Sequence, residues 1–153
     1  MNENLLDFIA LHVHSHLPHY NTIDVIIASS NISDQIKEIS EKLGQKWEFL
    51  DYSSEEDPDE FYRKFAQAIF EKNVIYIFVQ SDKIDEEFYN HLYSIRLSNQ
   101  FVRTGLSPRN DHFINPLPEE THIFLVFDSQ KTSNLNYQVW DMVDHCLETD
   151  KTN

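Results

Sequence analysis

Apolar residues along the chain follow two alternating patterns, a stripe at helical spacing and a short continuous run. The first stripe consists of Leu5, Leu6, Ile9, Val13 and Leu17 and stops at Pro18. This spacing predicts an amphipathic helix over residues 5–17. The β-branched run 23–28 predicts a strand, and the stripe that follows it ends at Gly44 and predicts a second helix.

The strand-then-helix order is repeated in the middle of the chain. Residues 47–52 have the composition of a strand. The segment Asp57-Pro58-Asp59-Glu60 offers a capping residue, a proline at the first helical position and a first-turn carboxylate, so a helix is predicted through about Glu71. The run 74–79 is apolar without alternation, which predicts a strand buried on both faces at the centre of a sheet.

The last third of the chain is predicted to hold two more helices and one strand. Ser81 or Asp82 is expected to cap a third helix of this alternating series, whose inward residues are Phe88, Leu92 and Ile95. Residues 100–120 carry three prolines and are expected to form a long connection to a strand at 122–127. The residues expected on the inner face of a final helix are Val139, Trp140, Val143 and Leu147, with Cys146 in the core.

Strands that alternate with helices at this spacing predict an α/β fold. We expect a doubly wound, mainly parallel sheet of about four to five strands with helices on both faces. A chain of 153 residues that is 41% hydrophobic can bury the core of one domain. Residues 1–147 are therefore predicted to form a single domain, and the polar residues 148–153 a disordered tail.

The order of these elements resembles the large α/β subdomain of the AAA+ ATPases, a class of P-loop NTPases. The residues that carry the resemblance are Ile23-Asp24-Val25-Ile26-Ile27, Glu48-Phe49-Leu50-Asp51-Tyr52-Ser53, Val74-Ile75-Tyr76-Ile77-Phe78-Val79 and Pro118-Glu119-Glu120-Thr121-His122-Ile123-Phe124. The resemblance covers about residues 5–129 and implies the P-loop arrangement of strands and helices.

The residues that this family uses for nucleotide hydrolysis are not present at the matching positions. Where the family has Gly-x-x-x-x-Gly-Lys-Ser/Thr, this chain has Ala28-Ser29-Ser30-Asn31-Ile32-Ser33-Asp34-Gln35, with no glycine and with Asp34 in place of the lysine. A carboxylate there repels the phosphates that a lysine attracts. Gln80 and Ser81 stand where the family has its Asp-Glu pair, and Asp128 or Ser129 stands in the region of its sensor residue. We expect neither a catalytic residue nor a nucleotide cofactor.

Net charge, apolar run length and cysteine content indicate which partners and which compartment to expect. A net charge of −14 opposes binding to phosphate backbones, so no direct nucleic-acid contact is predicted. The longest apolar run, 74–79, is far below the roughly 20 residues of a membrane span, so none is expected. A single cysteine and an N-terminus without a signal-peptide pattern predict a cytoplasmic protein.

Closely spaced histidines suggest a metal site, but the pattern is incomplete. The four are His12, His14, His16 and His19. On a helix, His12 and His16 share a face, as a pair of zinc ligands would. No third or fourth ligand is identifiable from the sequence, so metal binding by this cluster is left open and no metal site is assigned.

Aromatic and basic residues suggest a surface that contacts a protein partner. Six aromatic residues exceed what one small core requires and are expected at the surface, namely Tyr52, Tyr62, Tyr76, Tyr89, Tyr93 and Phe101. The predicted partner-binding residues are Tyr89, Tyr93, Arg96, Phe101, Arg103 and Arg109. The simpler interpretation is that these arginines form ion pairs with surface carboxylates of the same chain. The alternative is that they bind an anion or an acidic partner.

Three functional hypotheses follow. The first is a non-catalytic protein-interaction or regulatory module, a pseudo-ATPase-like subunit of a larger assembly. The second is an enzyme or small-ligand-binding domain that uses the carboxyl ends of the strands, where Ser29, Ser30, Ser81, Asp82, Asp128 and Ser129 lie. The third is an acidic inhibitor that mimics nucleic acid.

Overall fold

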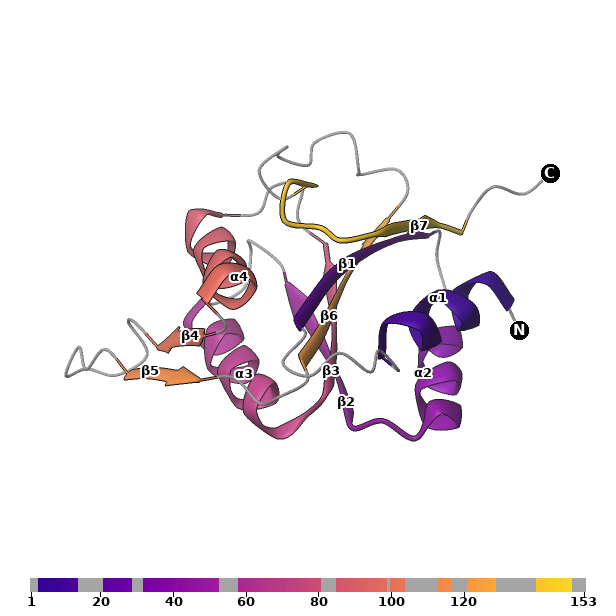
Figure 1. Cartoon of the computed structure of the whole chain (residues 1–153), viewed down its shortest axis with the longest axis horizontal. Helices are drawn as coiled ribbons and strands as arrows, with labels where there is room; N and C mark the ends of the chain where they lie inside the picture. Colours follow the sequence, from indigo (N-terminus) through magenta and orange to yellow (C-terminus); the bar gives the residue numbers. More distant parts are fainter. Residues whose placement is uncertain are drawn as a thin grey trace.

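The computed structural model describes residues 3–13, 21–28, 32–52, 58–80, 85–98, 100–103, 113–116, 121–128 and 140–149. Five parallel strands form one sheet in the order β2-β3-β6-β1-β7 (Figure 1). They are β1 (Asn21–Ala28), β2 (Trp47–Tyr52), β3 (Val74–Val79), β6 (Thr121–Asp128) and β7 (Cys146–Glu148). The predicted α/β fold with a parallel sheet is confirmed.

Helices cover both faces of this sheet, as predicted. They are α1 (Glu3–Val13), α2 (Ile32–Leu43), α3 (Pro58–Glu71) and α4 (Glu86–Ser98). In Figure 1, α1 and α2 lie on one side of the sheet and α3 and α4 on the other. Because side chains alternate along a strand, Ile26 and Ala28 of β1 pack with α1 and α2, whereas Ile23, Val25 and Ile27 pack in the core with α3 and α4. Each face of the sheet therefore has its own apolar core.

The middle of the sheet is β6, which lies between β3 and β1. The prediction that β3 is the central strand was therefore wrong, although β3 is an interior strand and is flanked by β2 and β6. Both strands are continuous apolar runs because each is covered on both faces. An apolar run identifies an interior strand, but it does not distinguish one interior position from another.

Local signals set the ends of two helices. Gly44 follows α2 with a φ of 71°, a left-handed conformation that favours glycine, so the predicted stop at Gly44 is confirmed. The residue that caps α4 is Asp85, whose carboxylate accepts a hydrogen bond from the Phe88 backbone N–H at 2.8 Å. The expected caps Ser81 and Asp82 lie outside the described residues.

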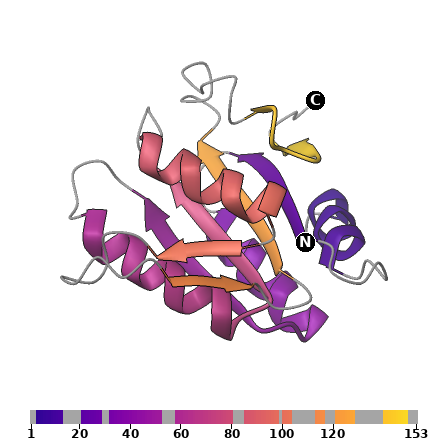
Figure 2. The same cartoon turned by 60° about the vertical axis from the view of Figure 1, so that its left-hand side comes forward.

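The connection between α4 and β6 contains secondary structure that the sequence analysis did not predict. β4 (Gln100–Arg103) directly follows α4 and pairs antiparallel with β5 (Phe113–Pro116), forming a two-stranded sheet beside α3 and α4 (Figure 2). Four-residue strands are too short to give a clear alternating pattern. These two strands are defined by their pairing with each other and not by a pattern in the local sequence.

The predicted final helix does not continue to Leu147, which lies in β7, and the residues before Trp140 lie outside the described residues. Trp140 is helical and residues 141–142 form a turn, in which the Val143 N–H donates to the Trp140 carbonyl at 3.2 Å, and the chain then enters β7. β7 pairs parallel with β1 at the edge of the sheet, and Cys146 is exposed rather than in the core. Trp140 and Val143 do pack on the core, which explains why their three-residue spacing resembled a helix.

Two residues of the predicted disordered tail belong to the described structure. Glu148 belongs to β7, and Thr149 donates a backbone hydrogen bond to the Ile27 carbonyl at 2.8 Å. Both residues were assigned to a disordered tail, whereas they extend the sheet along β1. Residues 150–153 lie outside the described residues.

Three of the tyrosines expected at the surface are buried. Tyr52, Tyr62 and Tyr76 are 3%, 0% and 1% exposed. Each hydroxyl has a partner, because Asp85 contacts the first two and Ser40 donates to the third at 2.8 Å. Their polar tips are thus satisfied inside the fold, which makes them core residues.

None of the helices in the described ranges has both the length and the apolar character required to span a membrane.

Candidate functional site

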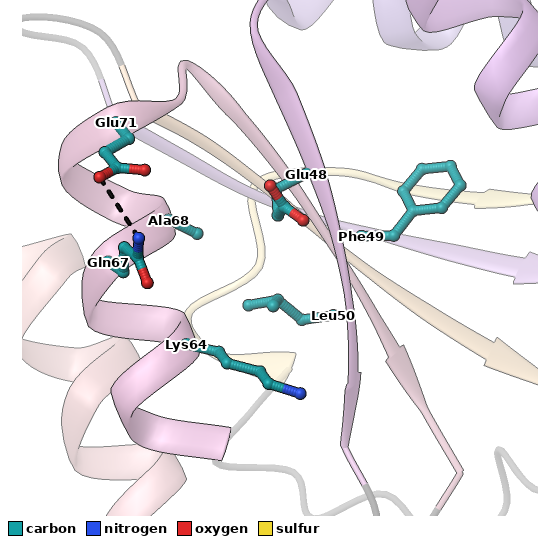
Figure 3. A pocket seen from close by; sticks show the side chains of 7 residues that line it. All are labelled: Glu48, Phe49, Leu50, Lys64, Gln67, Ala68 and Glu71. Atoms are coloured by element: carbon teal, nitrogen blue, oxygen red, sulfur yellow. Dashed lines mark hydrogen bonds between the residues drawn. The ribbon is translucent and has the colours of Figure 1, made fainter. Parts of the chain in front are cut away.

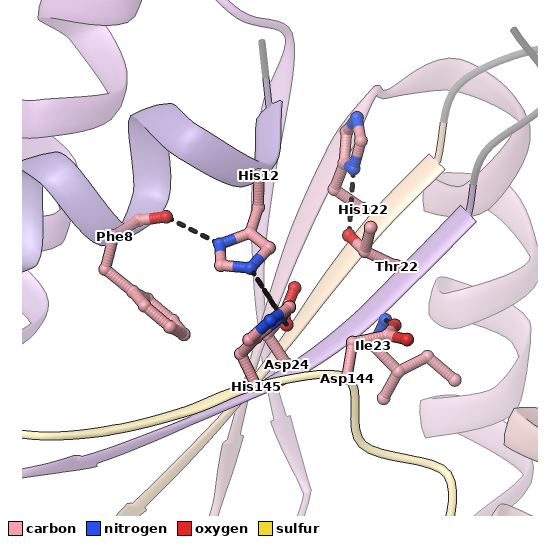
Figure 4. A network of polar contacts seen from close by, with 8 residues as sticks. All are labelled: Phe8, His12, Thr22, Ile23, Asp24, His122, Asp144 and His145. Atoms are coloured by element: carbon pink, nitrogen blue, oxygen red, sulfur yellow. Dashed lines mark hydrogen bonds and ion pairs between the residues drawn. The ribbon is translucent and has the colours of Figure 1, made fainter. Parts of the chain in front are cut away.

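A buried carboxylate lies in the middle of β1. Asp24 is 0% exposed, and it points toward the face of the sheet that α1 and α2 cover (Figure 4). Neither carboxylate oxygen has a hydrogen-bond partner of ordinary geometry among the described residues. Burial of a carboxylate without such partners costs folding free energy, so the groups that surround Asp24 must offset this cost.

Two histidine rings approach the same carboxylate oxygen. Asp24 Oδ1 lies 3.5 Å from His12 Nε2 and 3.7 Å from His145 Nδ1, and the two ring nitrogens lie 2.9 Å apart. His12 comes from the last turn of α1, and His145 directly precedes β7. Three segments that are distant in the sequence therefore meet at one point.

The pairing of β1 with β7 explains the position of His145. Val25 is paired with Cys146, so the preceding residues, Asp24 and His145, lie opposite each other. The Val25 N–H donates to the His145 carbonyl at 2.9 Å. Asp144 fixes the segment further, because its carboxylate accepts a hydrogen bond from the Ile23 N–H at 3.0 Å and its own N–H donates to the Ile23 carbonyl.

The ring of His12 has a defined orientation. Its Nδ1 lies 2.7 Å from the Phe8 carbonyl, which only accepts hydrogen bonds, so Nδ1 carries a proton. In the neutral ring this leaves a lone pair on Nε2, the atom that faces Asp24 and His145. The Phe8 ring, with its centroid 4.6 Å away, and the edge-on ring of Phe124 hold the imidazole in place.

The electrostatics of the cluster reflect its burial. The pKa of Asp24 is raised to about 6, chiefly by burial and also by the charge of Asp144, whereas His12, His145 and the nearby Thr22 hydroxyl act in the opposite direction. The side chain of His145 is 61% exposed, so the cluster is open to water on one side. Such an arrangement can hold a proton or a metal cation between its atoms.

This cluster was only partly anticipated. His12 was singled out, but with His14, His16 and His19, which lie outside the described residues. Asp24 was missed, although an acid inside an otherwise apolar, β-branched run was a usable signal, because a buried strand tolerates a carboxylate only beside suitable partners.

The position that would hold phosphate in a P-loop protein is the segment between β1 and α2. Three residues, 29–31, separate the end of β1 from the start of α2 and lie outside the described residues. Ala28 and Ile32 on either side are buried, and Asp34 is exposed in the first turn of α2. A carboxylate at a helix N-terminus interacts favourably with the helix dipole.

The structure brings part of the predicted partner surface together. Tyr89 and Tyr93 lie one turn apart on α4 with ring centroids 5.9 Å apart, and Tyr93 is 47% exposed. Arg96 lies further along α4, and Phe101 and Arg103 lie in β4, which follows it. Arg109 lies outside the described residues, so its placement in this surface stays a prediction.

A hollow of about 360 Å³ lies between β2 and α3 (Figure 3). Its lining consists of Glu48, Phe49, Leu50, Lys64, Gln67, Ala68 and Glu71. Glu48 is near the amino end of β2, whereas ligands of parallel sheets bind at the carboxyl ends of the strands. The hollow is therefore not the ligand site that the second hypothesis requires.

The carboxyl-end residues named by that second hypothesis are largely outside the described part of the chain. Ser29, Ser30, Ser81, Asp82 and Ser129 are not described. Asp128 is the last residue of β6 and is paired with Ala28 of β1. A ligand site formed by these residues stays a prediction.

Comparison with known proteins supports the fold. No protein-family model and no curated protein sequence matches this chain. Among solved structures, the P216G mutant of RuvB from Thermotoga maritima is similar, with a TM-score of 0.60 and 13% sequence identity. The match covers 100% of this chain and 47% of that one, so the chain spans just under half of the RuvB length. This chain therefore has an α/β fold like that of RuvB, an AAA+ ATPase.

Proposed function

We propose that this chain is an AAA+-like interaction or regulatory module that works without hydrolysing nucleotide, as a pseudo-ATPase-like subunit of a larger assembly. The observation that carries the proposal is the connection between β1 and α2. In a fold like that of an AAA+ ATPase, the sequence of this connection does not suit phosphate.

A phosphate-binding loop requires room and positive charge. In the Gly-x-x-x-x-Gly-Lys-Ser/Thr motif, backbone N–H groups surround the phosphates and the lysine balances their charge. Here three residues connect β1 to α2, none of them is glycine, and Asp34 occupies the first turn of the helix. The short connection and the carboxylate both disfavour a bound nucleoside triphosphate.

The end of β3 supports the same proposal. Gln80 follows this strand, donates its backbone N–H to the Tyr52 carbonyl at 2.9 Å, and donates its side-chain amide to Asp51 at 3.2 Å. An amide does not bind Mg²⁺ or activate water as a carboxylate does. A hydrolytic role would need an acid at this position.

The partner is proposed to be a protein with an acidic contact surface that binds α4 and the β4–β5 sheet. Tyr93 and Tyr89 supply an aromatic contact, and aromatic side chains together with arginine are enriched at binding hot spots. Arg96, Arg103 and Arg109 are concentrated in this part of a chain whose net charge is −14. Charge complementarity therefore favours an acidic partner here.

Affinity capture from the native host tests this proposal. The wild type is compared with a Tyr89→Ala, Arg96→Ala, Arg103→Ala variant, and with a control Arg63→Ala, Lys64→Ala variant that removes two exposed cations from α3. The proposal predicts a protein captured by the wild type and the control but lost by the triple variant, with all three folded by circular dichroism. The same captured proteins in all three samples, or none in any, would contradict it.

A further inference from the structure

We propose that His12, Asp24 and His145 form a binding site for one divalent transition-metal ion, with zinc as the best match. Each residue offers one ligand atom, and these atoms lie within 4.8 Å of one another. The three residues belong neither to the β1–α2 connection nor to α4, so the site is independent of the function proposed above.

The three ligand atoms have the spacing that a small cation requires. His12 Nε2, His145 Nδ1 and Asp24 Oδ1 form a triangle with sides of 2.9, 3.5 and 3.7 Å. A point equidistant from its corners is about 2.0 Å from each, which matches zinc bond lengths of roughly 2.0–2.2 Å to imidazole nitrogen and carboxylate oxygen. The site needs little rearrangement to accept the ion.

The protonation of His12 suits a metal ligand. Its Nδ1–H donates to the Phe8 carbonyl, and this leaves Nε2 free to coordinate. Histidine ligands of metals commonly donate their other N–H to a carbonyl or carboxylate, which fixes the ring orientation. The Phe8 carbonyl has this supporting role here.

When both histidine rings are neutral, the cluster has too few N–H donors for its hydrogen-bond acceptors. His12 Nε2 is then an acceptor, so a single N–H on His145 Nδ1 must serve both His12 and the Asp24 carboxylate. The shorter contact of His145 is to His12, at 2.9 Å, and Asp24 is left with none of ordinary geometry among the described residues. A cation at the centre contacts all three lone pairs at once.

The chemistry of the ligands narrows the choice of metal. Two imidazole nitrogens and one carboxylate oxygen suit zinc and its transition-metal neighbours, whereas Mg²⁺ and Ca²⁺ prefer oxygen ligands. The exposed side of His145 gives the ion a route from solvent and leaves a fourth position for water. The bound ion would tie the end of α1 to β1 and to the chain that enters β7.

Titration of the purified, metal-free protein with Zn²⁺ and with Co²⁺ tests this proposal. Binding is followed by calorimetry for Zn²⁺ and by the visible absorption of four-coordinate Co²⁺. Two variants remove ligands, His145→Ala at an exposed position and Asp24→Asn with nearly unchanged shape. The matched control, His14→Ala, His16→Ala, His19→Ala, removes three other histidines of the sequence cluster and keeps the three proposed ligands.

The wild type and the control are expected to bind one equivalent of each ion. Each ligand variant is expected to weaken binding at least about tenfold, because loss of a supporting residue alone costs that much. Circular dichroism shows whether each variant folds, and the two ligand variants act at different depths in the structure, so one misfolded variant leaves the other informative. The proposal is overturned if the wild type binds neither ion, if both ligand variants bind as tightly as the wild type, or if only the control loses binding.

Discussion

Asp24 of β1 lies directly opposite His145, the residue that precedes β7, and its Oδ1 is 3.7 Å from the His145 Nδ1. This contact joins two parts of the chain that are separated by 121 positions in the sequence. His12 completes the contact from α1. The first helix, the first strand and the last strand are thus linked through one polar cluster on the α1 side of the sheet (Figure 4).

Metal binding at this cluster predicts a change in thermal stability. An ion that binds only the folded state at a hundred times its dissociation constant stabilises the protein by about 2.7 kcal/mol. For a chain of this size that corresponds to a rise in melting temperature of roughly 5–10 °C. Melting curves with Zn²⁺ and after chelation measure this rise, and His145→Ala is expected to remove it. An equal rise in that variant would assign the effect to another site.

Asp85 is predicted to stabilise the junction of β2, α3 and α4. Its carboxylate accepts hydrogen bonds from the Phe88 N–H and the Tyr62 hydroxyl, both at 2.8 Å. Asp85→Ala removes a helix cap and leaves a buried hydroxyl without its acceptor, which together cost about 2–4 kcal/mol. Asp85→Asn keeps an acceptor and a good cap, so chemical denaturation should show a much smaller loss. Equal losses for the two variants would contradict this role.

Ser40 and Tyr76 are predicted to be coupled. The Ser40 hydroxyl donates to the Tyr76 hydroxyl at 2.8 Å, between α2 and β3, and both side chains are buried. Ser40→Ala or Tyr76→Phe alone leaves one buried hydroxyl without its partner and costs about 1–2 kcal/mol. The double variant is expected to cost less than the sum of the two by about 1 kcal/mol. Additive losses in a double-mutant cycle would show that this hydrogen bond contributes little.

His91 is predicted to make the fold less stable in mild acid. Burial lowers the pKa of His91 to about 4, and the neighbouring Asp85 offsets this only partly. The unfolded chain binds this proton near pH 6.5 and the folded chain resists it, so stability falls as the pH drops from about 6.5 to 4. The contribution is on the order of 3 kcal/mol over that range. His91→Leu should flatten this part of the stability curve, and an unchanged slope in the variant would exclude His91 as its source.

The parts of the fold that local sequence predicts are those with long, regular patterns. α2 and α3 carry apolar stripes over three turns or more, and the predicted range of β3 is the observed one. β4, β5 and β7 were missed because strands of three or four residues are defined by the partner they pair with. That partner lies elsewhere in the sequence, where no local window includes it.

The candidate site was harder to predict than the fold for the same reason. His12 and His145 are 133 positions apart, and only the pairing of β7 with β1 brings His145 opposite Asp24. The buried tyrosines show a related effect. Tyr52 and Tyr62 were assigned to the surface because the chain has more aromatic residues than one small core requires. Asp85, the acceptor that allows the burial of Tyr62, comes from the start of another helix.

We propose that this chain, whose fold is like that of RuvB, functions without binding nucleotide. Calorimetric titration of the purified protein with Mg-ATP tests it most directly. We expect no saturable heat up to about 1 mM nucleotide, which corresponds to a binding free energy weaker than roughly −4 kcal/mol. Saturable binding with a micromolar dissociation constant would contradict this proposal and favour a ligand site at the carboxyl ends of the strands.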